Sequence, residues 1–484
     1  MTSVLRRDWE AGAVALAIAA ASAVWPPAAL FAGVGVGVVA VWRRPALGLE
    51  VAAILVLVVR PSLDIFSERR FGLGPFAMNP SVAIGMVVLG LAVLALVKRG
   101  SEGLPIWPDR EVRLVHILLL AAYLLEFASG FRFYGAQGFG EGVRELLRVL
   151  SIVAAFLVTW WWVTSGENYR RGWAYLGAGA IVPLGVSLWQ LATGHGFSDI
   201  AGIYRIQGTF SHPNAYSQYL VPFIVVSVAG LGSRRGAPRL ALIAVALGLS
   251  VLVALSYTRT AELALVLGLI TVPFLQRGRI GLAGMLRGVA VITGFGLLGW
   301  LLVGKTVSER FSTLAIGREA IVAAETGESE NSLEWRLVNW GVLVTLGMEH
   351  PLVGHGAGMT TVLNPIVNAD NGVPFNAHDD FVRFFFEGGV VGLALYGLYA
   401  LGLCRWAIRR ARASPEGVSP TAFGVAAAVL ALVVLTGGTT ELSLQTADLY
   451  QLYGMLALVA GVPMLSAADR AAPAAGTVRA GGNG

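Results

Sequence analysis

Long apolar runs recur along the whole chain, and most are long enough to cross a lipid bilayer. A hydrocarbon core about 30 Å thick needs about 20 helical residues. Backbone polar groups must be satisfied within lipid, so such runs fold as helices. Only 13% of the 484 residues are charged, about half the roughly 25% found in soluble domains. The predicted fold class is an all-α polytopic membrane protein, a bundle of about 12–14 transmembrane helices.

Lysine and arginine residues alternate between the loops in a regular way. If the N-terminus lies inside, the short inner loops receive most of these residues, as the positive-inside rule requires. The sequence therefore predicts a multi-pass inner (cytoplasmic) membrane protein with both termini cytoplasmic. The predicted segments are 11–25, 28–42, 45–60, 78–97, 113–129, 146–165, 173–192, 217–232, 240–256, 261–276, 288–304, 385–404, 421–437 and 448–466.

We expect a single transmembrane domain over residues 1–466 and a disordered cytoplasmic tail over 467–484. Residues 305–384 are predicted to form one large extracytoplasmic loop, and loops of that length are usually functional. Cys404 is the only cysteine, which excludes an intrachain disulfide. The basic residues are scattered, so no nucleic-acid partner is expected. The oligomeric state is left open.

Two arginines lie near predicted outer turns. Arg259 stands in a short gap between apolar runs, where it either anchors a helix at the interface or binds an anion through its planar fork of donors. Arg205 precedes Pro213, a position where a helix can begin with Ser211 or His212 as its cap. His212 is interpreted as a cap neighbour rather than a catalyst.

A charged stretch leads into the segment at 385–404. Asp379, Arg383 and Glu387 are spaced i, i+4, i+8 and share one helical face, which predicts a self-compensated stripe at the membrane boundary. His378 is the titratable group on the loop side, and a neutral imidazole can act as a general base. The spacing of His378, Asp379 and Asp380 matches no common metal-ligand pattern, so neither a metal nor a cofactor is expected.

Residues 334–348 are predicted to be helical, and the glycines that follow are interpreted as a tight turn rather than a phosphate loop. The region also resembles a known family. His378, Glu387, Gly389 and Gly392 are similar to the H-N-x-x-L-x-x-L-x-E-x-G-x-x-G signature of the O-antigen ligase and polymerase superfamily, with Asp379 in place of its usual asparagine. The sequence also resembles three other patterns of that family. They are R-x-x-x-W…P-L-x-G-x-G (Arg336, Trp340, Pro351, Leu352, Gly354, Gly356), G-x-x-x-H-P-N (Gly208, His212, Pro213, Asn214) and an S-x-S-R-x-A-like segment (Ser256, Arg259, Thr260).

The resemblance implies a membrane glycosyltransferase of the GT-C-like architecture. Such an enzyme transfers a glycan from an undecaprenyl-diphosphate carrier to the hydroxyl of a lipid- or glycan-linked acceptor at the outer side of the inner membrane, with inversion and without a metal. His378 would deprotonate or position the acceptor hydroxyl. Arg205, Arg259 and Arg336 would neutralise the departing diphosphate. The supporting residues would be Asp379, Arg383, Glu387, His212 and Asn214.

Two other functions remain open at this point. A polymerase of the same superfamily shares the donor chemistry and differs only in its acceptor. A transporter or lipid flippase would place ionisable residues at mid-bilayer and carry repeated halves. The candidates here gather near the predicted outer face, and the sequence has no evident internal repeat.

Overall fold

The structure is a computed structural model, and it describes residues 43–471 apart from 67–70, 74–75, 79, 167, 196–197, 201–202, most of 278–331, 368–373 and 445. The predicted segments at 11–25, 28–42 and 288–304 therefore lie outside the described residues, as do the start of the predicted loop and residues 472–484. Within the described part, nine helices are long and apolar enough to cross a membrane. The chain is an all-α polytopic membrane protein, as its apolar runs predict.

The long helices follow the predicted segments, and four short strands were not predicted. In chain order they are α3 (Pro45–Ile54), η1 (Leu55–Val59), η2 (Arg60–Ser62), η3 (Asp64–Phe66), β1 (Phe71–Leu73), β2 (Phe76–Met78), α4 (Pro80–Ser101), α5 (Arg110–Thr164), α6 (Tyr169–Thr193), β3 (Ser198–Ile200), β4 (Ile203–Arg205), α7 (Pro213–Gly230), η4 (Leu231–Ser233), α8 (Ala237–Leu255), the helix Arg259–Arg277, α11 (Ser332–Gly347), α12 (Thr360–Leu363), α13 (Asp380–Ala413), α14 (Ser419–Ala431), η5 (Leu432–Thr436), α15 (Gly437–Thr440), η6 (Leu442–Leu444) and α16 (Thr446–Ala471). The strands form two short antiparallel hairpins, β1–β2 and β3–β4.

Helix α5 contains two membrane passages rather than one. Its backbone leaves the helical region at Gly135, where φ is 56° and ψ is −126°. A Cβ atom built on Gly138 would lie 1.9 Å from the carbonyl oxygen of Gly130, although a continuous helix would separate the two residues by about 12 Å. The chain therefore turns back at Gly135. The two halves match the separate predicted segments 113–129 and 146–165.

Small residues allow neighbouring helices to approach closely in the bundle. A Cβ atom on Gly424 of α14 would lie 2.8 Å from the Cα atom of Val226 in α7, and one on Gly268 would meet Val225 at 2.9 Å. Helices within lipid have no hydrophobic driving force for association, so they associate largely through close packing at small residues. The centre of the bundle is filled by fully buried aromatic side chains, including Trp160, Trp161, Trp162, Tyr450 and Tyr453.

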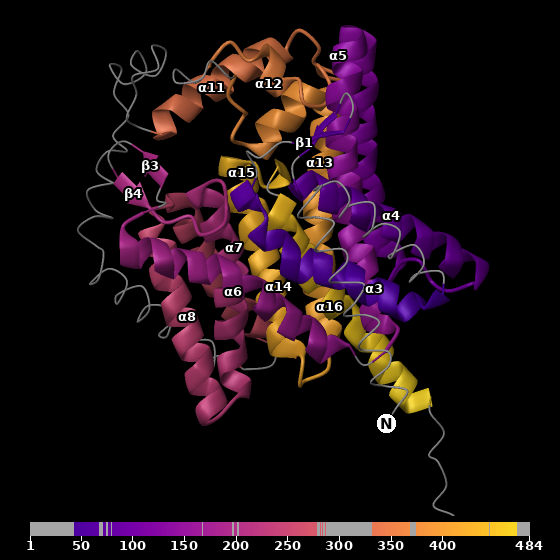
Figure 1. Ribbon diagram of the computed structural model, residues 1–484, viewed down its shortest axis with the longest axis vertical. Coiled ribbons are helices and arrows are strands. Elements are labelled where there is room, and N and C mark those ends of the chain that lie inside the picture. The colour runs from indigo at the N-terminus through magenta and orange to yellow at the C-terminus, as the bar shows by residue number, and fades with distance from the viewer. Residues whose placement is uncertain are drawn as a thin grey trace, which may run out of the picture.

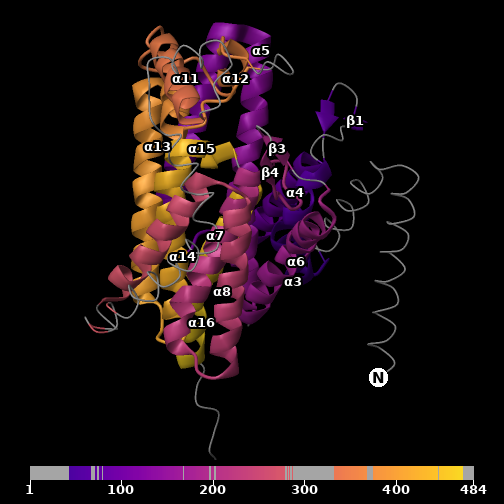
Figure 2. The same cartoon turned by 90° about the vertical axis from the view of Figure 1, so that its left-hand side faces the viewer.

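The two ends of the bundle are built from different features. At one end, Arg405, Arg409 and Arg410 of α13 form ion pairs with Asp109 and Glu111 at the start of α5. Both segments belong to loops predicted to be cytoplasmic. At the opposite end, α11 and α12 lie beside the tip of α5, above the helices of the bundle (Figures 1 and 2).

Candidate active site

The region around His378 is shaped by a sharp turn within α13. Gly389 has φ 62° and ψ −162°, outside the helical region. The carboxylate of Asp380 accepts a 2.8 Å hydrogen bond from the Tyr396 hydroxyl, and the Phe384 and Tyr396 rings stack at 4.1 Å. Sixteen residues of continuous helix would span about 24 Å. The prediction of one uninterrupted segment over 385–404 is therefore wrong, because residues 380–388 fold back against the transmembrane part of α13.

His378 is held in a left-handed backbone conformation directly before α13. Its φ is 53°, and Asp379 then caps the helix by accepting a 2.8 Å hydrogen bond from the Val382 N–H. Helix α11 fixes the preceding residues from the other side. Asn339 and Trp340 donate hydrogen bonds of 2.9 and 2.8 Å to the carbonyl oxygens of Asn376 and Ala377. The position of His378 is thus set by contacts on both of its flanks.

Arg205 joins three segments that are far apart in the sequence. Its guanidinium donates hydrogen bonds to the Ser256 carbonyl (2.8 Å), the Thr258 hydroxyl (3.0 Å) and the Asn214 side chain (3.1 Å). Arg205 is buried. This network ties the β3–β4 hairpin to the starts of α7 and of the helix Arg259–Arg277. Arg205 and Asn214 therefore have a demonstrable structural role at this end of the bundle.

Positive charges gather around His378. Arg336 on α11 has a buried Nε atom without a hydrogen-bond partner in the described part of the chain. Burial and then the charge of Arg259 lower the pKa of Arg336. Loss of hydration, then the charge of Arg336, then that of His212 lower the pKa of His378 to about 3. Neighbouring positive charges disfavour the imidazolium form and favour an incoming anion.

His212 belongs to the same cluster. It is the N-cap of α7, and its Nδ1 atom accepts a 3.1 Å hydrogen bond from the Asn214 N–H. Loss of hydration and the charges of Arg205 and Arg336 lower the pKa of His212 to about 4. The predicted helix start at Pro213 with a His212 cap is confirmed. The five predicted site residues His212, Arg205, Arg259, Arg336 and His378 thus lie around one place, linked through their mutual charges.

Backbone features point to the same place. The helices that begin at Pro213, Arg259 and Asp380 each start next to this cluster, and helix N-termini present free N–H groups that favour anions. Three non-glycine residues have positive φ in the described chain: Tyr257, His378 and Glu441. Strained backbone of this kind gathers at functional sites.

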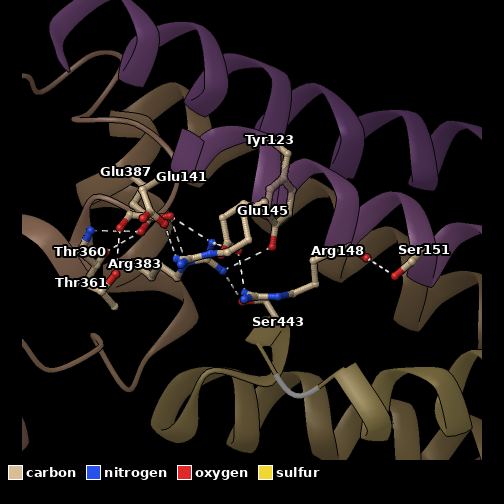
Figure 3. Close-up of polar contacts among 12 residues, drawn as sticks. Tyr123, Glu141, Glu145, Arg148, Ser151, Thr360, Thr361, Arg383, Glu387 and Ser443 are labelled. Carbon is tan, nitrogen blue, oxygen red and sulfur yellow. Dashed lines mark hydrogen bonds and ion pairs between the residues drawn. The ribbon is translucent and has the colours of Figure 1, made fainter. Parts of the chain in front are cut away.

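A buried ionic network is centred on Arg383, five residues after His378 in the sequence (Figure 3). Arg383 pairs with Glu387 at 3.0 Å, as their spacing predicts, and with Glu145 of α5 at 3.2 Å. It also donates a 2.8 Å hydrogen bond to the Ser443 hydroxyl. The second oxygen of Glu387 accepts a 2.7 Å hydrogen bond from Thr360. The network fixes the short helix 380–388 and therefore the residues that precede it.

The predicted charged stripe of Asp379, Arg383 and Glu387 is wrong for Asp379, which does not pair with Arg383. Asp379 caps the helix instead of pairing with Arg383, and Glu145 supplies the second carboxylate from another helix. Burial, with the nearby Asp380, raises the pKa of Asp379 to about 6 against the opposing effect of its backbone hydrogen bonds.

Glu441 is a candidate site residue that sequence reasoning missed. It is buried between α15 and η6, and its carboxylate accepts a hydrogen bond from the backbone N–H of His378. Its Oε1 atom has no partner in the described part of the chain. Burial raises the pKa of Glu441 to about 8. The available signal was an ionisable residue in the short gap between the apolar runs 421–437 and 448–466.

A comparison with protein families gives a match at this region. The O-antigen ligase family model matches residues 240–397. This match supports the resemblance to the O-antigen ligase superfamily. No curated protein matches the chain. The family implies a membrane glycosyltransferase-type enzyme with a ligase or polymerase role. The matched residues include Arg259, Arg336 and His378, whereas Arg205 and Glu441 lie outside them.

The glycines of the O-antigen ligase signature have a steric explanation in the structure. A Cβ atom on Gly389 would lie 2.3 Å from the Leu352 carbonyl carbon, and one on Gly354 would lie 2.3 Å from the Glu387 carbonyl carbon. Gly356 approaches Gly130 of α5 with the same closeness, at 2.2 Å. The turn at 350–358 therefore packs directly against the break in α13. This close packing explains why glycine is required at these positions of the signature. The predicted tight turn is confirmed, since Gly354, Gly356 and Gly358 all have positive φ.

Proposed function

We propose that this protein transfers a glycan from an undecaprenyl-diphosphate carrier to an acceptor hydroxyl, with inversion and without a metal ion. The acceptor oxygen forms a bond to the anomeric carbon while the bond from that carbon to the diphosphate oxygen breaks. The electron pair leaves with the diphosphate, and the acceptor proton passes to the imidazole of His378. Both chemical steps then occur between His378 and the arginine cluster.

One observation carries the proposal: the half-buried guanidinium groups of Arg336 and Arg259 repel one another beside an imidazole that is neutral at physiological pH. The charge of Arg259 lowers the pKa of Arg336, so a diphosphate bound between the two guanidinium groups would offset their repulsion. Charge-assisted hydrogen bonds from arginine to phosphate are among the strongest in proteins. His378 is neutral and can accept a proton, and the negative charge of a bound diphosphate would offset the neighbouring positive charge that lowers its pKa.

The remaining residues take supporting roles in this proposal. Arg205 and Asn214 hold the segments that carry the anion site, and His212 borders it. Arg383 and Glu387 fix the short helix behind His378, and Asp379 caps it. We place the site at the outer side of the inner membrane, because the opposite end of the bundle carries the basic loops that the positive-inside rule assigns to the cytoplasm. Both termini would then be cytoplasmic, and the bilayer itself would hold the lipid tail of the donor.

The test uses purified protein in liposomes with a labelled undecaprenyl-diphosphate glycan and a panel of acceptors, in the presence of EDTA. We expect transfer by the wild type. The His378→Ala variant should fold and insert normally yet transfer nothing, and His195→Ala, a change at an exposed loop histidine, should transfer as the wild type does. Undiminished turnover by His378→Ala would refute the role of the imidazole.

The product of the same assay separates the two family activities. Glycan found on a carrier-free acceptor identifies a ligase, and a lengthened glycan that remains on the carrier identifies a polymerase. Movement of the intact carrier lipid across the bilayer without bond cleavage would instead identify a flippase and overturn the proposal.

A further inference from the structure

The connection between α15 and α16 contacts the start of α13 at three positions. Glu441, which is buried in this connection, accepts a hydrogen bond from the backbone N–H of His378. The Ser443 N–H donates to the carboxylate of Asp380 at 3.1 Å, and the Ser443 hydroxyl donates to the same carboxylate. That hydroxyl also accepts a 2.8 Å hydrogen bond from Arg383 (Figure 3). The connection therefore binds the segment that carries the imidazole.

The backbone of His378 needs such support because its conformation is strained. Its φ of 53° lies in the left-handed region, which residues with a Cβ atom disfavour. A residue keeps this conformation only where its surroundings hold it. Both edges of the peptide unit between Ala377 and His378 are held. Its carbonyl oxygen accepts a 2.8 Å hydrogen bond from the Trp340 indole, and its N–H donates to Glu441. Loss of the second contact would allow His378 to relax toward extended backbone and move its imidazole.

The carboxyl of Glu441 is mostly uncharged at neutral pH. Burial raises its pKa to about 8, against the opposing charge of Arg383. An uncharged carboxyl still accepts a hydrogen bond through its carbonyl oxygen. A negative charge at this place would favour the imidazolium form of His378. The neutral side chain can therefore hold the backbone of His378 without opposing the neutral state of the imidazole.

We propose that Glu441 is a positioning residue that holds His378 through its backbone N–H, and that Ser443 assists by anchoring Asp380 and Arg383; this rests on the proposed function. Neither Glu441 nor Ser443 exchanges a proton with the acceptor. Both lie beyond residues 240–397, which the O-antigen ligase family model matches. The active site is thus completed by a segment outside the matched region.

The test measures transfer rates at several concentrations of labelled undecaprenyl-diphosphate glycan, with the best acceptor of the wild type. Glu441→Leu should lower kcat about 10-fold, the equivalent of about 1.4 kcal/mol, because the imidazole is no longer held in place. The KM for the donor should stay within about two-fold, since Arg259 and Arg336 lie on other helices. Glu441→Gln should keep at least about half of the wild-type kcat, because its amide oxygen accepts the same hydrogen bond.

Two further variants complete the experiment. Glu416→Leu is the matched control, because it makes the same change at an exposed carboxylate, and it should leave kcat and KM unchanged. Ser443→Ala decides the matter if Glu441→Leu fails to fold. Arg383 keeps its ion pairs with Glu145 and Glu387 in that variant, so the protein should fold. Its kcat should fall about 3- to 10-fold, as expected for loss of one hydrogen-bonding hydroxyl, with the donor KM unchanged.

Three results would overturn the positioning role while His378→Ala stays inactive and the proposed function stands. The first is a wild-type kcat in folded Glu441→Leu, or in Ser443→Ala if the leucine variant does not fold. The second is a kcat in Glu441→Gln as low as in Glu441→Leu, since the acceptor oxygen would then be insufficient. The third is a donor KM that rises as much as kcat falls, which indicates a general loss of structure. Undiminished turnover by His378→Ala would remove the proposed function and this inference together.

Discussion

The chemistry of the candidate site depends on how one charge changes the state of its neighbour. His378 faces Arg336 and His212, and these neighbours together with burial keep its imidazole neutral. Arg336 in turn faces Arg259. The site therefore differs from the self-neutralised ion-pair cluster of Arg383, because neighbouring positive charges hold the imidazole of His378 in its basic form.

This electrostatic state predicts an unusual pH profile. An unperturbed histidine base would give kcat/KM an acid limb with a midpoint near 6.5. The pKa of His378 is about 3, so the imidazole stays in its basic form down to that pH. We expect no acid limb near 6.5 between pH 5 and 7.5, measured in an Asp379→Asn background that removes the carboxyl with a pKa of about 6. A midpoint at 6.5 in that variant would contradict the electrostatic assignment.

At the scale of the elements, turns and caps determine where the functional groups lie. Gly135 and Gly389 reverse the chain within what would otherwise be single long helices. Helical periodicity and hydropathy carry no information on these reversals, because they depend on contacts with segments distant in the sequence. The start of α7 and the extent of α11 could be predicted, since proline and local patterning determine them.

The turn at Gly389 gives a direct stability prediction. Gly389→Ala should prevent correct folding or lower the thermal midpoint strongly, because alanine must adopt positive φ and its Cβ would overlap the 352–353 backbone. Gly397→Ala is the control on the same helix, since nothing lies within 4 Å of its Cβ position; it should be neutral or stabilise by up to about 1 kcal/mol. Thermal unfolding in detergent measures both. Equal stabilities for the two variants would show that the helix does not break as described.

The N-cap of α13 gives a pH-dependent prediction. The pKa of Asp379 rises from 3.8 to about 6 on folding, so the folded state prefers the protonated carboxyl. The stability that this preference contributes is present at low pH and is lost as pH rises through 6. Asparagine caps equally well without a charge. Asp379→Asn should therefore stabilise the protein by about 1 kcal/mol at pH 7.5 and by little at pH 4.5, measured by thermal unfolding. A destabilised variant at pH 7.5 would contradict this.

At the scale of the whole molecule, the site is assembled from segments spread over more than 200 residues of sequence. Arg205, Arg336 and Glu441 come from different elements and meet around His378. The bundle could be predicted from the sequence, and the choice of candidate arginines drew on the family resemblance. Glu441 and the second partner of Arg383 could not be predicted, because a lone glutamate in an apolar stretch does not reveal which distant group it contacts.

The central claim is that the converging guanidinium groups bind a diphosphate beside His378. The most direct test is equilibrium binding of fluorescent undecaprenyl diphosphate to the purified protein. Arg336→Gln should weaken binding about 10- to 100-fold, the range expected for one charge-assisted contact, without lowering the thermal midpoint, because it removes repulsion with Arg259. His378→Ala, and Arg235→Gln at an exposed position, should bind as the wild type does. Wild-type affinity in Arg336→Gln would contradict the claim.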